Sequence, residues 1–181
     1  IKLIPIMKTI RRIMIVAGIV FTAVFLTAAC DDDDKNDQTT VIGTWNLVES
    51  KADVTPVATA TQTEEQLESQ IANYLLIAVN SRIVITNKSV TFPLSVNGGT
   101  TQSKTYQYVL NDGIMSIASP MAGVPDLLGD IDLTDNVLKI TFAGDSYMKL
   151  LQALAAKDAT FKTVVDQIAS ASIYYRMKRI N

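Results

Sequence analysis

The chain has 181 residues, of which 48% are hydrophobic, and it carries 16 basic and 18 acidic side chains. This length and apolar content suit one globular domain with a sizeable core. Because the chain has one cysteine and no histidine, the sequence excludes an internal disulfide, Ser-His and Cys-His nucleophile pairs and the commonest zinc ligand.

Residues 1–29 have the layout of a secretory signal peptide. Lys8, Arg11 and Arg12 stand just before an uncharged run, IMIVAGIVFTAVFLTAA, at residues 13–29. The run is shorter than the roughly 20 residues of a typical spanning helix, so we expect residues 1–29 to be cleaved off as a signal peptide. We also expect Met7 to be the true start. Removal would leave 12 basic and 18 acidic residues, a net charge of about −6. Such a chain offers no basic face for nucleic acid.

Cys30 stands between this segment and the acidic run DDDDK at residues 31–35. DDDDK matches a protease site used to remove expression tags, but a tag scar would not follow an export signal that ends in Ala-Ala-Cys. LTAAC resembles the lipobox of bacterial lipoproteins, with Leu26 one place earlier than usual. The resemblance implies a lipid on Cys30 that anchors the protein to a membrane.

An acidic run directly after the lipidated cysteine also resembles the surface-export signal of Bacteroidetes-type lipoproteins. It implies an outer-membrane protein that is lipid-anchored and faces the cell exterior. We therefore expect residues 30–40 to form a lipidated acidic tether and residues 41–181 to form the folded domain.

The folded domain begins with a predicted strand, VIGTWNLVES. Trp45 and Leu47 share one face of it, and only Val48 breaks the alternation. A loop is expected over residues 54–62. Thr63 and Gln66 have the spacing of a capping box, which predicts a helix from residue 63 to residue 80 with one apolar face.

Beyond residue 81 the apolar residues alternate, which predicts further strands joined by short turns. Asn111-Asp112-Gly113 is the strongest hairpin signal. Two helices are expected before the last strand, with Asp145 and Asp158 as their N-caps. The expected strands after the first are 82–86, 89–96, 103–110, 114–118, 130–134, 137–144 and 172–180.

Eight strands in such an order predict a mainly β domain, an up-and-down antiparallel barrel. One helix is inserted after the first strand and two precede the last. Closure of the barrel leaves no unpaired strand edge, and the first and last strands become neighbours.

Gly43, Thr44 and Trp45 resemble the G-x-W signature at the first strand of lipocalins. The resemblance implies that Trp45 closes one end of the barrel and that a basic residue of the last strand lies over it. Of Arg176, Lys178 and Arg179, we assign Arg176. The inserted helices depart from lipocalins and are similar to lipocalin-like domains of Bacteroidetes-type lipoproteins, which are mostly of unknown function.

Aromatic side chains on the predicted strands are candidate ligand contacts. They either line a cup for a small apolar molecule or fill the barrel as ordinary core. The loop over residues 119–130, with apolar side chains such as Met121 and Leu128, is either a lid or an exposed partner patch. The candidate ligand-binding residues are Phe92, Tyr106, Tyr108 and Phe142.

Four aspartates lie close together in the sequence, but their spacing matches no EF-hand loop and aspartate is common in turns. We expect no metal, no cofactor and no enzymatic activity. We expect the protein to be a monomeric envelope lipoprotein that binds a small hydrophobic ligand. The alternative is an interaction module for another envelope protein or a surface glycan. The four aspartates are Asp126, Asp130, Asp132 and Asp135.

Overall fold

The computed structural model describes residues 41–119 and 121–180. The predicted start at Met7, the signal segment, Cys30 and the acidic tether lie outside the described residues. The barrel belongs to a compact unit spanning Asn36–Asn181. Every described strand pairing and all of the described core lie within this unit, so we expect the unit to fold alone.

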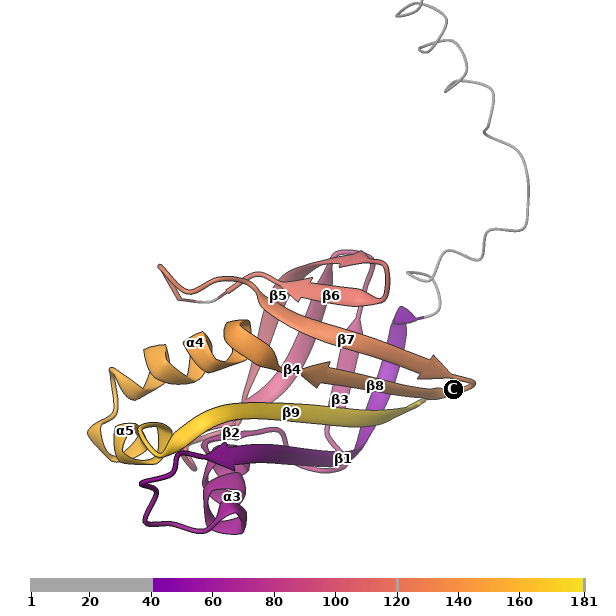
Figure 1. The fold of residues 1–181 in the computed structure, drawn as a ribbon. Coiled ribbons are helices and arrows are strands. Elements are labelled where there is room, and N and C mark those ends of the chain that lie inside the picture. The colour runs from indigo at the N-terminus through magenta and orange to yellow at the C-terminus, as the bar shows by residue number, and fades with distance from the viewer. Residues whose placement is uncertain (1–40, 120, 181) are drawn as a thin grey trace, which may run out of the picture. The chain divides into compact units, whose positions relative to one another are not determined.

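The described residues form a closed eight-stranded antiparallel barrel in up-and-down order (Figure 1). A β4–β5 pairing closes the ring, and the short strand β2 (Leu75–Leu76) adds to the end of β4. The predicted fold is therefore confirmed. The eight strands are β1 (Gly43–Pro56), β3 (Arg82–Ile85), β4 (Ser89–Val96), β5 (Gln102–Asn111), β6 (Ile114–Ile117), β7 (Leu127–Thr134), β8 (Val137–Phe142) and β9 (Ile168–Arg179).

The first and last strands form the longest seam of the barrel, as predicted. Their pairing runs from Trp45 opposite Arg179 to Pro56 opposite Ile168, with a register shift at Val48. This bulge exchanges the two faces of β1, because odd-numbered residues are buried before it and even-numbered ones after it. It explains why Val48 breaks the alternation. The expected loop at residue 54 begins only after Pro56.

Helix α3 (Glu64–Tyr74) begins with the predicted capping box. The Gln66 amide donates to Thr63 Oγ1 at 3.3 Å, and the Thr63 amide donates to Gln66 Oε1 at 3.0 Å. The prediction that this helix reaches residue 80 is wrong, since Leu75 and Leu76 pair with β4 instead. Sheet pairing overrides the helical spacing there.

Helices α4 (Gly144–Ala155) and α5 (Ala159–Val165) precede β9. Asp158 caps α5, with its Oδ1 accepting from the amides of Thr160 and Phe161 at 2.9 and 3.0 Å. The N-cap of α4 is Ala143 and no side chain caps it, so the assignment of Asp145 is wrong. None of the helices in the described residues has the length and apolar character needed to cross a membrane.

The predicted NDG hairpin is present between β5 and β6, where Asp112 and Gly113 both have positive φ, 49° and 76°. Figure 1 shows helices α3, α4 and α5 at one end of the barrel, opposite the end at which β9 finishes. Part of the interior near the finish of β9 is filled by side chains. Six side chains there are fully buried: Trp45, Leu47, Ile83, Met115, Leu138 and Met177.

Candidate ligand-binding cavity

Trp45 closes the end of the barrel at which β9 finishes. Its indole Nε1 donates to the Val41 carbonyl at 2.8 Å. The Arg179 guanidinium carbon lies 4.4 Å from the indole centroid, and Arg179 Nη1 donates to the Ile42 carbonyl at 2.9 Å. Gly43 lies under this guanidinium with φ 153°, and a Cβ there would stand 2.7 Å from Arg179 Nη1. A basic residue therefore does cover the tryptophan, as the G-x-W resemblance implied.

The covering residue is Arg179 and not Arg176, which corrects the assignment made from sequence. Strand alternation is the reason, because the buried residues Tyr175 and Met177 of β9 are odd-numbered and Arg176 points outward. Arg176 is half exposed there, with Nη1 at 3.7 Å from Glu49 Oε2. The parity of the last strand was a usable sequence signal that the prediction missed.

The opposite, helix-bearing end of the barrel is hollow. A cavity of about 320 Å³ lies between the inner faces of the strands, the β6–β7 loop and helix α4. Its interior is built from buried side chains and its rim from exposed ones. The interior residues include Phe92, Ile117, Phe142, Tyr147, Ile173 and Tyr175, and the rim residues include Val96, Lys104, Ala118, Pro125 and Lys157.

Three of the four predicted contact residues meet in this cavity: Phe92, Tyr106 and Phe142. The ring centroids of Phe92 and Tyr106 are 6.4 Å apart. Tyr108 is not among the described lining residues, and its hydroxyl donates to the Thr86 carbonyl at 2.6 Å. It holds the hairpin between β3 and β4. The barrel is thus hollow at its helix-bearing end, and side chains such as Trp45 fill part of the other end.

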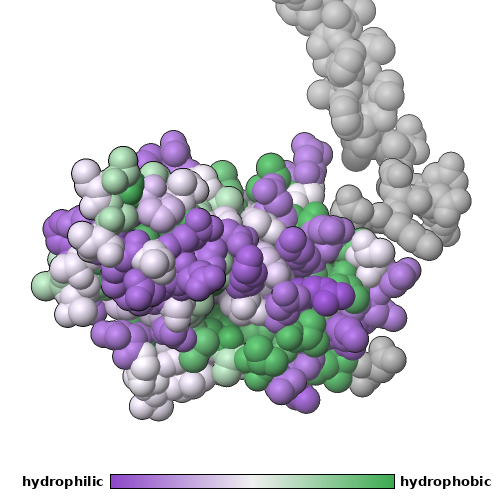
Figure 2. Space-filling model, turned by 60° about the horizontal axis from the view of Figure 1, so that its bottom comes forward, coloured by the Kyte–Doolittle hydropathy of each residue, from purple (hydrophilic) through white to green (hydrophobic). Residues whose placement is uncertain are grey.

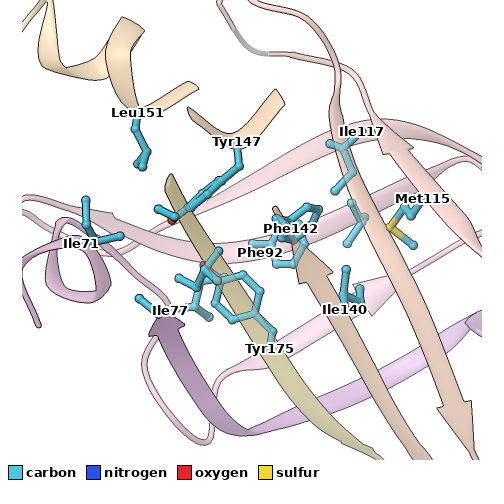
Figure 3. Packing of buried hydrophobic residues seen from close by; sticks show 14 of the residues in the cluster. Ile71, Ile77, Phe92, Met115, Ile117, Ile140, Phe142, Tyr147, Leu151 and Tyr175 are labelled. Carbon is cyan, nitrogen blue, oxygen red and sulfur yellow. The ribbon is translucent and has the colours of Figure 1, made fainter. Parts of the chain in front are cut away.

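Two tyrosines outside the prediction complete the aromatic interior. Tyr175 of β9 lies between Phe92 and Phe142, with centroid distances of 6.4 and 6.2 Å. Figure 3 shows Tyr147 reaching from helix α4 toward Tyr175. Burial raises the pKa of Tyr175 and raises that of Tyr147 well above its usual value. The apolar face of α4 was visible in the sequence, but not the surface that it covers.

A glycine shapes one wall of the cavity. Gly129 of β7 faces Phe142, and a Cβ at Gly129 would lie 2.6 Å from Phe142 Cε1 and 2.8 Å from Ile140 Cγ2. The missing side chain lets the Phe142 ring approach the β7 backbone closely. A larger residue at this position would push the Phe142 ring into space that is now open.

The β6–β7 loop belongs to the cavity wall. Met121, Pro125 and Leu127 line the cavity. For these residues, the interpretation of the apolar loop as a lid is favoured over an exposed partner patch. Leu128 points the other way and is 47% exposed. The prediction that the loop extends to residue 130 is wrong, because β7 begins at Leu127.

The aspartates near this loop have local structural roles. Asp126 Oδ1 accepts from the Ser119 amide at 3.2 Å, and Asp132 Oδ1 accepts from Thr134 Oγ1 at 3.3 Å. Asp135 occupies a turn position with φ 52°. Within residues 41–119 and 121–180, no group of three or more potential metal-binding side chains comes together.

The rim of the cavity is positively charged. Among the described lining residues, Lys104 and Lys157 are the ionised side chains, and no carboxylate accompanies them. A second hollow of about 620 Å³ lies at the Trp45 end, where Leu110, Ile131 and Leu133 line it together with Val41 and Arg179. It begins where the described part of the chain starts, and we assign no site to it.

Searches against protein-family models, curated proteins and solved structures found no match to this chain. The closed eight-stranded antiparallel barrel is consistent with a lipocalin-like fold. The site must therefore be argued from its own geometry, because a fold alone does not define a function.

Proposed function

We propose that this protein binds a small, largely apolar molecule in the hollow end of its barrel. The observation that carries the proposal is the cavity of about 320 Å³ lined by Phe92, Phe142 and Tyr175. Ligand sites are typically concave, mostly apolar and about 300–1,000 Å³ in volume. The cavity is at the small end of this range, which favours a single acyl chain or one compact ring system.

Binding without catalysis fits the chemistry of the lining. Phenols with raised pKa values stay protonated at neutral pH and cannot act as bases. The two rim lysines are exposed, so nothing shields them from water in the way that activates a lysine nucleophile. We propose a carrier or receptor for the ligand.

The same proposal places the protein on the outer membrane, anchored through a lipid on Cys30 and facing the cell exterior. Its support is the sequence: the export segment, Ala-Ala-Cys and the acidic run that follows. Wild type should incorporate labelled fatty acid and fractionate with membranes, whereas Cys30→Ala should do neither. Unchanged labelling in Cys30→Ala would overturn the anchor, and survival of the protein during protease treatment of intact cells would overturn the outward orientation.

Ligand binding is tested on the unit Asn36–Asn181. Native mass spectrometry of material from the original host should detect a bound small molecule. A solvatochromic apolar dye should bind wild type, fail to bind Leu94→Trp, which adds bulk to the cavity wall, and bind Gln107→Trp, which adds the same ring to an exposed position of β5. Equal dye binding by all three proteins would place the dye outside the cavity and contradict the proposal.

A second candidate, an interaction module for another envelope protein or a surface glycan, is favoured by exposed apolar side chains. Val109 is 58% exposed, and strand register connects it through Ser116 to Leu128. Figure 2 shows hydrophobic side chains gathered among hydrophilic ones on one face of the molecule. Crosslinking on intact cells that is lost in Val109→Ser and kept in Leu94→Trp would favour this function over ligand binding.

A further inference from the structure

A fully buried polar atom of a cavity-lining residue has no hydrogen-bond partner among the described residues. Tyr147 is 2% exposed, and its hydroxyl is the buried side-chain polar atom without a hydrogen-bond partner among the described residues. The same residue lines the cavity. Figure 3 shows its hydroxyl end directed toward the Tyr175 side of the cavity.

An unsatisfied buried hydroxyl is unfavourable, because the group loses its hydrogen bonds to water and gains none in return. Phenylalanine would fill the same volume without this penalty. Tyr108, another buried tyrosine, is satisfied, because its hydroxyl donates to the Thr86 carbonyl at 2.6 Å. The unsatisfied hydroxyl of Tyr147 thus belongs to a residue that lines the cavity of about 320 Å³.

We propose that Tyr147 recognises a ligand that carries a neutral hydrogen-bond acceptor, such as an ester or ketone carbonyl, on an apolar skeleton. This inference rests on the proposed ligand-binding function and specifies the class of ligand. The hydroxyl donates to the acceptor, while the Phe92, Phe142 and Tyr175 rings surround the apolar part. Tyr147 is thus a specificity-determining residue, supplied by helix α4.

The acceptor is neutral because of what surrounds the hydroxyl. A carboxylate buried there would lose its hydration, and the described interior offers no cation to replace it. The cationic side chains, Lys104 and Lys157, lie at the exposed rim. An anionic ligand would therefore place its charge at the rim and leave Tyr147 unused.

The chemistry is tested with three probes of similar length: methyl decanoate, decanoate and undecane. Their affinities for the unit Asn36–Asn181 are measured by displacement of the apolar dye. Tyr147→Phe should weaken methyl decanoate about tenfold, which corresponds to about 1.4 kcal/mol, and change undecane and decanoate by less than about twofold. Tyr108→Phe is the matched control, because it removes a hydroxyl outside the cavity, and it should leave all three affinities unchanged.

Two further readouts keep the test decisive if Tyr147→Phe folds poorly. The ester carbonyl stretch of bound methyl decanoate should lie at lower frequency than in hydrocarbon solvent, and return to the hydrocarbon value in Tyr147→Phe. Ligand-free Tyr147→Phe should melt about 2–4 °C higher than wild type, whereas Tyr108→Phe should melt lower.

The outcomes separate this inference from the function on which it rests. If undecane binds but methyl decanoate shows no dependence on Tyr147 and an unshifted carbonyl band, the cavity binds ligands and the inference is wrong. If Tyr147→Phe weakens undecane as much as the ester, the tyrosine only shapes the cavity, and the inference is again wrong. If no probe binds wild type, the proposed function fails first.

Discussion

The two arginines near the end of β9 should contribute very different amounts to the stability of the barrel. Arg179→Ala removes the guanidinium 4.4 Å from the Trp45 centroid and the 2.9 Å hydrogen bond to the Ile42 carbonyl. A cation–π contact contributes about 0.5–2 kcal/mol and a hydrogen bond from a charged donor about 1.5–3 kcal/mol. Because Arg179 is partly exposed, we take the low end of each range. We expect the free energy of unfolding to fall by about 2 kcal/mol.

Arg176→Ala is the matched control, three residues away on the same strand. Its ion pair with Glu49 spans 3.7 Å, and the two side chains are 48% and 45% exposed. Exposed pairs of this kind contribute between about 0 and 1 kcal/mol, so we expect a loss of less than about 0.5 kcal/mol. Arg179→Lys should fall between the two alanine variants, because it keeps the charge and loses the planar group.

Urea unfolding followed by tryptophan fluorescence measures all three variants, since Trp45 is the single tryptophan of the chain. The emission reports directly on the sealed end of the barrel. A loss in Arg176→Ala equal to or larger than that in Arg179→Ala would refute the assignment of Arg179 as the closing residue. It would restore the assignment made from sequence.

Three further predictions address the cavity and the helices. Gly129→Ala should destabilise the barrel by about 1–3 kcal/mol in urea unfolding and weaken undecane binding, because its Cβ would displace the Phe142 ring; unchanged binding would contradict this account of the wall. Asp158→Ala should cost about 1–2 kcal/mol and Asp145→Ala less than about 0.5 kcal/mol, because only the former caps a helix; equal losses would contradict it. Burial raises the pKa of Tyr175, so the phenol ionises at lower pH in the unfolded chain than in the folded one. The free energy of unfolding, measured with urea across a pH series, should therefore decline above about pH 10. An equally steep decline in Tyr175→Phe would show that other groups cause it.

The topology could be predicted because its signals are local. Short turns such as Asp112-Gly113 and the alternation of apolar residues define each hairpin, and consecutive hairpins leave closure as the way to pair the edges. The Thr63–Gln66 capping box located a helix start to the residue. The errors fell where nonlocal pairing decided the outcome, as at Leu75 and Leu76, which helical spacing assigned to a helix and β4 holds as a strand.

The site was predicted only in part because a cavity is a relation between elements. Strand parity brought Phe92, Tyr106 and Phe142 inward, but nothing local tells whether the space between such rings is filled. That depends on where helix α4 lies and on the missing side chain of Gly129. Parity alone would have identified Arg179, since it continues the buried series of Tyr175 and Met177.

The two ends of the barrel show what the inserted helices contribute. At the Trp45 end, an arginine and a buried indole seal the strands. At the other end helix α4 supplies the cover, and its Tyr147 introduces a fully buried hydroxyl that has no hydrogen-bond partner among the described residues. A cover that served only stability would gain from phenylalanine at that position. The proposed role in ligand recognition gives the hydroxyl a function apart from folding, and the ligand-free stability of Tyr147→Phe tests this directly.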